Sequence, residues 1–443
     1  MTAPARPPIL SETLAWLAQC DALPPAVDAK ARLLLLDTVG CLLAGLRHGE
    51  VGRLGAALTT FFPGTLAWSG APHALGPAGL AALGAAAACW DEACEGHAAA
   101  HGRPALPVVP ALLALAAQRE TSLGALLLAL VTGYEIGARA GQAWRIPAGL
   151  HVDGSWHSLG AAAAAARLTA GPAAMASAVE AAACQIPASL YLPIAQGSVL
   201  RNTYPAHAAL LGMLAAAAAQ AGFAMPAGAL DEGRVRVLRA STPAEIAPPG
   251  TWTILDGYLK PFAGVRHTHY GVEAALRLRA VPGFAANDIR AIRLAVYEEA
   301  VRYCGNRAPR TAIQAQFSLS YATAAALALG HLDPAAYGDA LADPEIKRLE
   351  AMVAVEVDPA RSGRGAVLTV DLGGKELRQE VASVIGDPNQ PMTADRARAK
   401  FLRYAAPSLG AERAAAVAAA LLDRDPRRPL ETLSFLIDVR KLA

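Results

Sequence analysis

The sequence predicts a mainly α protein with two lobes, a large helical lobe and a smaller α+β lobe. Two observations lead to this prediction. A chain of 443 residues is longer than one hydrophobic core usually serves. Long alanine- and leucine-rich segments of helical pattern fill its first half, and alternating, strand-like segments appear only after Pro261. With 54% hydrophobic and 17% charged residues, both lobes should be well packed.

The helical lobe is predicted from Glu12 to about Leu230, where glycine and proline separate the apolar segments. The high alanine content permits close contact between helices, and core packing accounts for most residues of these segments. The predicted helices are 27–46, 77–88, 108–119, 123–143, 158–170, 172–185 and 205–221.

Strand-like alternation marks the α+β lobe. The last two predicted strands flank Gly373 and Gly374, a pair typical of a tight hairpin turn. The predicted strands are 289–297, 351–358, 366–372 and 376–383, and the predicted helices of this lobe are 270–280 and 313–329.

Helical pattern resumes near the C-terminus, at 393–404 and 409–422, with Thr393 as a candidate N-cap. These helices are predicted to rejoin the helical lobe. The predicted domain ranges are 1–257 with 393–443 for the helical domain and 258–392 for the α+β domain.

Charge and hydropathy exclude several classes of partner. A net charge of +2, with basic residues spread along the chain, leaves no electrostatic footprint for nucleic acid. Two uncharged stretches, 181–200 and 208–230, are rich in alanine and glycine and contain proline and glutamine, whereas a membrane span needs about 20 mostly large apolar residues. The N-terminus carries Glu12 where a signal peptide has its apolar core. We expect a cytoplasmic protein without nucleic-acid or membrane partners.

The cysteines form no Cys-x-x-Cys pair and no zinc-like spacing, so we predict reduced core thiols. Their scatter also argues against an iron–sulfur cluster, which needs a grouped set of thiolates. They are Cys20, Cys41, Cys89, Cys94, Cys184 and Cys304.

Chemistry-bearing side chains first gather in WDEACEGHAAAHGRP, residues 90–104. His97 and His101 stand four apart and would share a helix face as metal ligands with a carboxylate, as in a metal-dependent hydrolase. Glycine and proline interrupt such a helix, so we favour a polar loop that feeds a pocket and binds no metal. The ionisable residues of this loop are Asp91, Glu92, Glu95, His97, His101 and Arg103.

Two further candidates stand at helix starts. His157 directly precedes the helix predicted at 158–170, where the helix dipole favours the neutral imidazole that a general base requires. A capping or core histidine has the same pattern. Arg201 follows a glycine turn and leads into an apolar helix, a position that suits an anion.

The densest basic cluster is YLKPFAGVRHTH, residues 258–269, which carries Lys260, Arg266, His267 and His269. So many cationic or ionisable donors beside an apolar stretch are unusual in an alanine-rich chain. Tyr321 lies in the apolar helical segment QAQFSLSYATAAAL, where a tyrosine is more often a core residue with a satisfied hydroxyl.

In this order, these segments resemble the MmgE/PrpD family, which includes 2-methylcitrate dehydratase, cis-aconitate decarboxylase and iminodisuccinate epimerase. The resemblance covers nearly the whole chain. Besides the acidic loop, the matching segments are LLLLDTVGCLLAG (33–45), PVVPALLALA (107–116), GSWHSLGAAAAAARL (154–168), GSVLRNTYPAHAALLGMLAAAAAQAGF (197–223), YLKPFAGVRHTH (258–269), AQFSLSYATAAAL (315–327) and GDPNQPM (386–392).

The resemblance implies a large all-helical domain, a smaller α+β lid domain and a homodimer. It also implies chemistry without a cofactor or metal, at the carbon next to a carboxylate of a di- or tricarboxylic acid. Basic side chains would neutralise the substrate carboxylates, and charge-assisted hydrogen bonds of roughly 1.5–3 kcal/mol each would justify burying them.

The family's functional positions carry over unevenly. Asp91 matches the leading acid of the acidic loop, His157 the histidine before the small-residue helix, and Tyr321 the tyrosine of the Phe-Ser-Leu-x-Tyr segment. Lys260 matches directly, and Arg201 stands where many members have lysine.

These matches give the predicted site. His157 or His101 is the expected base, and Tyr321 or another histidine the expected acid. The predicted catalytic residues are His157, His101, Asp91 and Tyr321, and the predicted substrate-binding residues are Arg103, Arg201, Lys260, Arg266, His267 and His269.

The acidic loop departs from the family pattern. The family's Asp-Phe-Asp-Asp-Thr is here Asp-Glu-Ala-Cys-Glu, and its His-Pro corresponds either to Arg103-Pro104 or to a displaced His101. A histidine exchanges a proton at neutral pH and an arginine does not. The sequence therefore leaves undecided both the substrate and the catalytic role of this loop. We expect a dehydratase-like lyase. The alternatives are an epimerase or decarboxylase acting on a related acid, and a non-catalytic protein that binds small acids.

Overall fold

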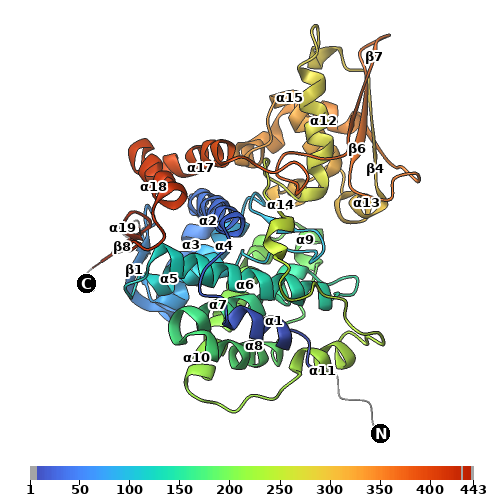
Figure 1. The fold of residues 1–443 in the computed structure, drawn as a ribbon. Helices are drawn as coiled ribbons and strands as arrows, with labels where there is room; N and C mark the ends of the chain where they lie inside the picture. Colours follow the sequence, from blue (N-terminus) through green and yellow to red (C-terminus); the bar gives the residue numbers. More distant parts are fainter. Residues whose placement is uncertain (1–6, 431–432, 441–443) are drawn as a thin grey trace.

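The computed structural model describes residues 7–430 and 433–440, and it is mainly helical, as the sequence predicts. A large helical body carries a smaller α+β unit (Figure 1). The helices of the body that precede the α+β unit are α1 (Ser11–Ala18), α2 (Pro25–Gly45), α3 (Gly49–Phe61), α4 (Pro77–Cys89), α5 (Val108–Ala116), α6 (Leu123–Ala143), α7 (His157–Ala170), α8 (Met175–Ala183), α9 (Leu192–Gln196), α10 (Tyr204–Gln220) and α11 (Ala229–Arg236).

Helix α7 occupies the middle of the body, with α5, α6, α8 and α10 packed around it. Its residues from His157 to Ala166 are all buried. Small side chains make this possible: a Cβ on Gly160 would lie only 2.5 Å from the carbonyl oxygen of Gly133 on α6. The alanine-rich pattern therefore places α7 against its neighbours at very short range.

Helix α6 has the length and apolar composition of a membrane span, yet 83% of its most apolar window is buried inside the protein. The core helix of a soluble protein has the same properties. The two uncharged stretches noted in the sequence form α8, α9, α10 and the segments around them.

The α+β unit is built on a four-stranded sheet of order β5-β4-β6-β7. β4 and β5 run parallel, and the other two pairs are antiparallel. Helix α12 packs on β6 and β7, and α15 packs on β5 (Figure 1). The elements of this unit are α12 (His269–Arg279), β4 (Ala291–Val296), α13 (Glu298–Cys304), α14 (Ala312–Gln316), α15 (Leu319–Leu329), α16 (Pro344–Met352), β5 (Val353–Val357), β6 (Ala366–Asp371) and β7 (Glu376–Val381).

The alternation in the sequence sets the register of this sheet. Ile292 and Leu294 of β4 are buried, and they lie opposite the buried Val370 and Leu368 of β6. A shift of one residue would expose the whole set, so the register is strongly specified. The predicted hairpin is confirmed, because β6 pairs with β7 across Gly373.

The chain then returns to the helical body. Helices α17 (Ala394–Leu409) and α18 (Ala411–Asp423) pack against α2, as Figure 1 shows for the red and blue helices. The Oγ1 atom of Thr393 accepts the N–H of Arg396 at 3.3 Å, which confirms the predicted N-cap. The division at residues 258 and 392 stays a prediction.

Two short strand pairs interrupt the expected all-helical body. β1 (Pro63–Trp68) pairs with β8 (Ile437–Val439), which follows the short α19 (Leu433–Leu436). β2 (Gly96–His97) pairs with β3 (Gly257–Tyr258). The β2–β3 pair joins the acidic loop to the start of the basic cluster, segments that are far apart in the sequence.

Several predicted boundaries were wrong for local reasons. The helix predicted at 313–329 breaks into α14 and α15, because the Oγ atom of Ser318 accepts the N–H of Tyr321 and starts a new helix. The strand predicted at 351–358 begins as the end of α16. Helices α3, α13 and α16 were not predicted.

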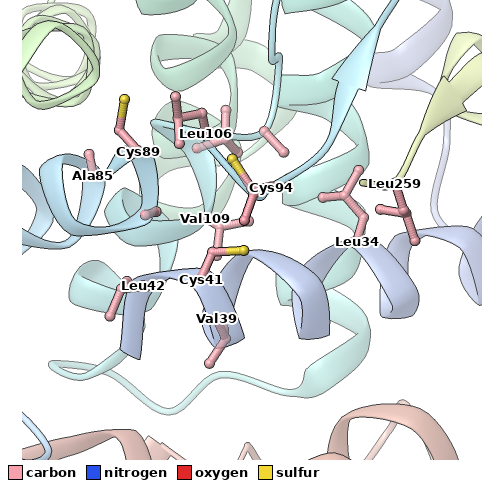
Figure 2. Packing of buried hydrophobic residues seen from close by; sticks show 14 of the residues in the cluster. Leu34, Val39, Cys41, Leu42, Ala85, Cys89, Cys94, Leu106, Val109 and Leu259 are labelled. Carbon is pink, nitrogen blue, oxygen red and sulfur yellow. The ribbon is translucent and has the colours of Figure 1, made fainter. Parts of the chain in front are cut away.

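The cysteine prediction holds for four of the six residues. All six thiols are free, and Cys41, Cys89, Cys94 and Cys304 are buried. Figure 2 shows the first three among leucine, valine and alanine side chains of one continuous core. Cys184 is exposed instead.

A buried lysine ties α17 to the rest of the body. The ammonium group of Lys400 donates to the Oδ1 atom of Asp37 on α2 at 2.6 Å, to the carbonyl of Ala93 at 2.6 Å and to the carbonyl of Lys260 at 2.7 Å. Both charged side chains are almost inaccessible to solvent. This contact therefore fixes the backbone of the acidic loop and of the basic cluster together.

Replacing Lys400 with methionine removes the charge and keeps most of the side-chain volume. Asp37 is then buried without a cation, so we expect the free energy of unfolding to fall by about 3 kcal/mol, measured by urea unfolding. Arg398→Met, on the same helix, breaks a more exposed pair with Asp423 and should cost no more than about 1 kcal/mol. Equal losses in the two variants would contradict the anchoring role.

Candidate active site

A cavity of about 440 Å³ lies where the helical body meets the α+β unit, lined by side chains from both. It gathers more than half of the side chains that the sequence singled out. The predicted site residues that line it are His101, Arg103, Arg201, Lys260, Arg266 and His267. The predicted residues outside its lining are Asp91, His157, His269 and Tyr321.

Glu92 joins three of the cavity's cations. Its Oε1 atom lies 3.0 Å from an Nη atom of Arg103 and also contacts the guanidinium of Arg201. Its Oε2 atom accepts from the ammonium of Lys260 at 3.0 Å, and its backbone carbonyl accepts from the same ammonium at 2.7 Å. All four side chains are buried.

Asp153 is the second carboxylate of this cluster. It lies in the short 3₁₀ turn η1 (Val152–Gly154), and Arg201 lies in another, η3 (Val199–Thr203). The Oδ2 atom of Asp153 lies 3.1 Å from the Nη2 atom of Arg201 and also contacts the guanidinium of Arg103. We call Glu92, Asp153, Arg103, Arg201 and Lys260 the inner cluster.

Both carboxylates of the inner cluster are ionised. Burial by itself raises the pKa of Glu92, but the charges of Arg103, Arg201 and Lys260 outweigh it and lower that pKa to about 2. Burial likewise opposes the charge on Asp153, yet the two guanidiniums hold its pKa well below the usual range. Three cations and two carboxylates leave the cluster with one net positive charge.

The acidic loop holds two residues in the left-handed region of backbone conformation, Glu92 with φ 51° and His101 with φ 54°. Such positions cost free energy and concentrate at functional sites. The turn at Glu92 directs its side chain into the cavity. The neighbouring Asp91 points elsewhere and binds the Nε2 atom of His48 at 2.9 Å. The sequence prediction named Asp91, and the acid that lines the cavity is Glu92.

His151 lines the cavity and was not predicted as a site residue. Its Nδ1 atom accepts the backbone N–H of Asp153 at 3.1 Å, and its ring stacks on Tyr191 with 5.8 Å between centroids. Its Nε2 atom lies 3.4 Å from the Nε atom of Arg201. Burial, reinforced by the charge of Arg201, lowers the pKa of His151 to about 3, so the ring is neutral. Gly149 and the Asp153-Gly154 pair were the local indications of a turn at this position.

His157 lies behind the cavity wall. Its Nε2 atom accepts the backbone N–H of Arg103 at 3.3 Å, and its ring stacks on Trp156 with 3.7 Å between centroids. Burial lowers the pKa of His157 to about 4. A Cβ on Gly102 would lie 3.1 Å from the same nitrogen, so the loop passes directly over the ring. The contacts of His157 hold the backbone that presents Arg103.

The basic cluster divides between the cavity and the protein interior. Arg266 lines the cavity, and its guanidinium contacts Asp387 of the GDPNQPM segment. His267 also lines it and binds the hydroxyl of Tyr297. His269 points away and binds the carbonyl of Gly264 through Nε2 at 3.1 Å.

Tyr321 uses its hydroxyl within the α+β unit. It donates to the carbonyl of Ala336 at 2.7 Å, and its ring stacks on Tyr337. The hydroxyl is therefore engaged, as it is in most core tyrosines.

Among the described residues, one group of potential metal-binding atoms lies within 4.8 Å of one another, on Cys89, Glu92 and Asp153. Guanidiniums already contact all three, including a 2.8 Å approach of Arg201 to the Cys89 sulfur. These cations repel a metal ion, so the donor set does not fit one. His97 and His101, the ligands considered for a metal-dependent hydrolase, are not in this group.

Two acids of the same loop have opposite pKa shifts. The carboxyl of Glu95 is buried, and its Oε1 atom accepts only the N–H of Ala105, at 3.0 Å. Within the described part of the chain its Oε2 atom has no partner. Burial raises the pKa of Glu95 to about 8, whereas the cations hold that of Glu92 at about 2.

These shifts predict opposite effects of charge removal on the melting temperature. The ordinary carboxyl value is 4.5, so ionised Glu92 stabilises the fold above that pH and loses this effect as pH falls toward 2. Glu95 stabilises the fold when protonated, below 4.5, and loses this effect as pH rises through about 8. Glu92→Gln should therefore melt lower than the wild type at neutral pH.

Glu95→Gln is the matched comparison. It should melt like the wild type near pH 4 and higher than the wild type near pH 9, because the glutamine keeps the acceptor and avoids a buried charge. Melting curves across this pH range measure both variants. If both variants shifted the melting temperature in the same direction at neutral pH, the opposite environments assigned to Glu92 and Glu95 would be wrong.

Comparison with known proteins supports the resemblance seen in the sequence. The model of the MmgE/PrpD N-terminal domain matches residues 13–245, and the model of the MmgE/PrpD C-terminal domain matches residues 262–424. A search of curated proteins found no significant match. The family contains hydro-lyases, which supports a lyase-type activity. Since the two matches span nearly the whole chain, the protein belongs to the MmgE/PrpD family.

Proposed function

We propose that the protein is a cofactor-independent, dehydratase-like lyase that removes a proton from the carbon α to a carboxylate of a di- or tricarboxylic acid. One observation carries this proposal: buried cations and neutral imidazoles converge on a single cavity. Cations recognise carboxylates, and neutral imidazoles accept protons. Family membership adds the lyase class of reaction.

The inner cluster is the proposed binding site for the reacting carboxylate. Lys260, Arg103 and Arg201 already share two internal carboxylates, and one net positive charge remains for a ligand. Arg201 is further placed by the ring of Phe317, 5.4 Å from its guanidinium carbon. Such fixed donors need little reorganisation when the substrate arrives.

His151 is the proposed base, in place of His157. It lines the cavity beside Arg201, whereas His157 is engaged by the backbone of Arg103. An anionic substrate next to the ring raises its pKa from the low value of the empty site, which makes it a better base once the substrate is bound. His157 then acts as a positioning residue for the Arg103 loop.

The proposed reaction balances as follows. The base form of His151 is the tautomer with its ring hydrogen on Nδ1, so the ring gives up the Asp153 N–H as a donor to Nδ1. Its Nε2 atom then takes the α proton, and the electron pair of the C–H bond moves into the adjacent carboxylate. The cations of the inner cluster stabilise the charge that develops there. The electron pair then returns to form the Cα–Cβ double bond as the Cβ–O bond breaks. The β-hydroxyl leaves as water with the proton of a second imidazole that is cationic before this step, such as His101, whose Nδ1 atom lies 3.8 Å from Glu299, and an α,β-unsaturated acid remains.

Related reactions use the same first step. An epimerase returns the proton to the opposite face, and a decarboxylase loses carbon dioxide from a neighbouring carbon. A non-catalytic acid-binding protein needs the inner cluster and no proton transfer. The homodimer and the cytoplasmic location stay predictions.

The test follows exchange of the α proton for deuterium by NMR, with a panel of di- and tricarboxylic acids in deuterated water. At least one acid should exchange or react. His151→Gln should reduce the rate by about 10²–10⁴-fold, the usual contribution of a general base.

His157→Gln is the matched variant. It should lower the rate less than His151→Gln, because its contact acts through the Arg103 backbone. A larger loss in His157→Gln would return the catalytic role to His157. Binding without exchange for every acid would favour the non-catalytic alternative.

A further inference from the structure

Among the described arginines that line the cavity, Arg364 is the one without a hydrogen bond or an ion pair, and the carboxylate of Glu299 acts on it only from a distance. It lies in the loop between β5 and β6 and is partly buried. Among residues 7–430 and 433–440 it makes no hydrogen bond and no ion pair. Its guanidinium carbon lies 5.6 Å from the ring centre of Tyr258, which is a cation–π contact and supplies no negative charge.

The other cations of the cavity have polar partners. The inner cluster contains two carboxylates, and Arg266 contacts Asp387. At the mouth, Arg302 lies 2.9 Å from Glu298, and Arg145 donates to the carbonyl of Ala99 at 2.8 Å, with Glu299 on the same wall. Removing a cation from water without an anion costs free energy, so a partly buried guanidinium without an ion pair, facing a cavity, indicates a ligand.

The fixed charges of the cavity indicate how many carboxylates it accepts. The inner cluster keeps one positive charge, the pair of Arg266 and Asp387 is neutral, and Arg364 adds one more positive charge. His267 adds none, because burial and the charge of Arg364 lower its pKa to about 3. Two negative charges therefore neutralise the interior, and a third would have no buried partner.

Tyr258 holds Arg364 close to the rest of the site. Its ring lies between two guanidiniums, with Arg266 at 4.8 Å and Arg364 at 5.6 Å from the ring centre. The ring also packs against β2, since a Cβ on Gly96 would lie 2.3 Å from its hydroxyl oxygen. Lys260 follows two residues later on the same segment.

We propose that Arg364 binds the second carboxylate of the substrate and that the site is selective for dicarboxylates. This inference rests on the proposed function, in which the first carboxylate binds the inner cluster. Arg364 is then a specificity-determining residue contributed by the α+β unit. A monocarboxylate leaves it unpaired, and a tricarboxylate carries one charge too many.

Calorimetric titration of the full-length protein tests this proposal with succinate, glutarate, the half-amide of each and citrate. The half-amides keep the carbon skeleton and lose one charge. The wild type should bind its preferred dicarboxylate at least about tenfold more tightly than the matching half-amide and more tightly than citrate. Arg364→Gln should weaken dicarboxylate binding about tenfold and half-amide binding less than about twofold.

Arg378→Gln is the control, because Arg378 is exposed on β7 and does not line the cavity. It should bind every probe like the wild type. Thermal melting gives a second readout: without ligand, Arg364→Gln should melt at the wild-type temperature or above it, because it removes a partly buried charge that has no ion pair. An arginine that only supports the loop would lower the melting temperature and weaken both kinds of ligand equally.

The outcomes separate this inference from the proposed function. Selective loss of dicarboxylate binding in Arg364→Gln supports the inference even if no acid shows α-proton exchange. Exchange in the wild type, with equal effects of Arg364→Gln on dicarboxylates and half-amides, overturns the inference and leaves the proposed function standing. The inference is also overturned if the wild type binds none of the probes, or if it binds each dicarboxylate and its half-amide equally tightly.

Discussion

The site depends on one constraint: cations can be kept in the interior only where carboxylates accompany them. Glu92 and Asp153 meet this constraint for Arg103, Arg201 and Lys260, which would otherwise repel one another in a medium that screens charge poorly. The compensation is incomplete by one charge. A site of this kind holds its donors in place without a ligand and still attracts an anion, which is the condition that electrostatic preorganisation requires.

The fold brings the charged residues of the inner cluster together from segments that are distant in the sequence. The acidic loop follows α4, the turn η1 precedes α7, the turn η3 precedes α10, and Lys260 follows the β3 strand. Close packing of the helices in the body, with α7 in the middle, determines the positions of these loops and turns. The ammonium of Lys400 then joins the acidic loop, the basic cluster and α2 through three hydrogen bonds. Rigid helices carry the site, and short irregular turns direct its side chains into the cavity.

The sequence was sufficient for the long helices of the body, the sheet and most of the cations, because periodicity and basic clusters are local properties. It was insufficient where the role of a residue depends on the direction in which its side chain points. Asp91 and Glu92 are adjacent acids, and only the left-handed backbone at Glu92 determines which one enters the cavity. His151 and His157 flank the same turn, and burial behind Arg103 distinguishes them. Arg364 stands in a polar loop without a motif, and its role depends on a tertiary position that no local pattern reveals.

A crystal structure of the protein with bound succinate tests the central claim most directly. The account predicts one carboxylate within about 3.2 Å of nitrogen atoms of the inner cluster and the other within a similar distance of Arg364, with Glu92 and Asp153 still ionised beside the arginines. Succinate bound outside the cavity, or Glu92 and Asp153 turned away from Arg103 and Arg201, would contradict it.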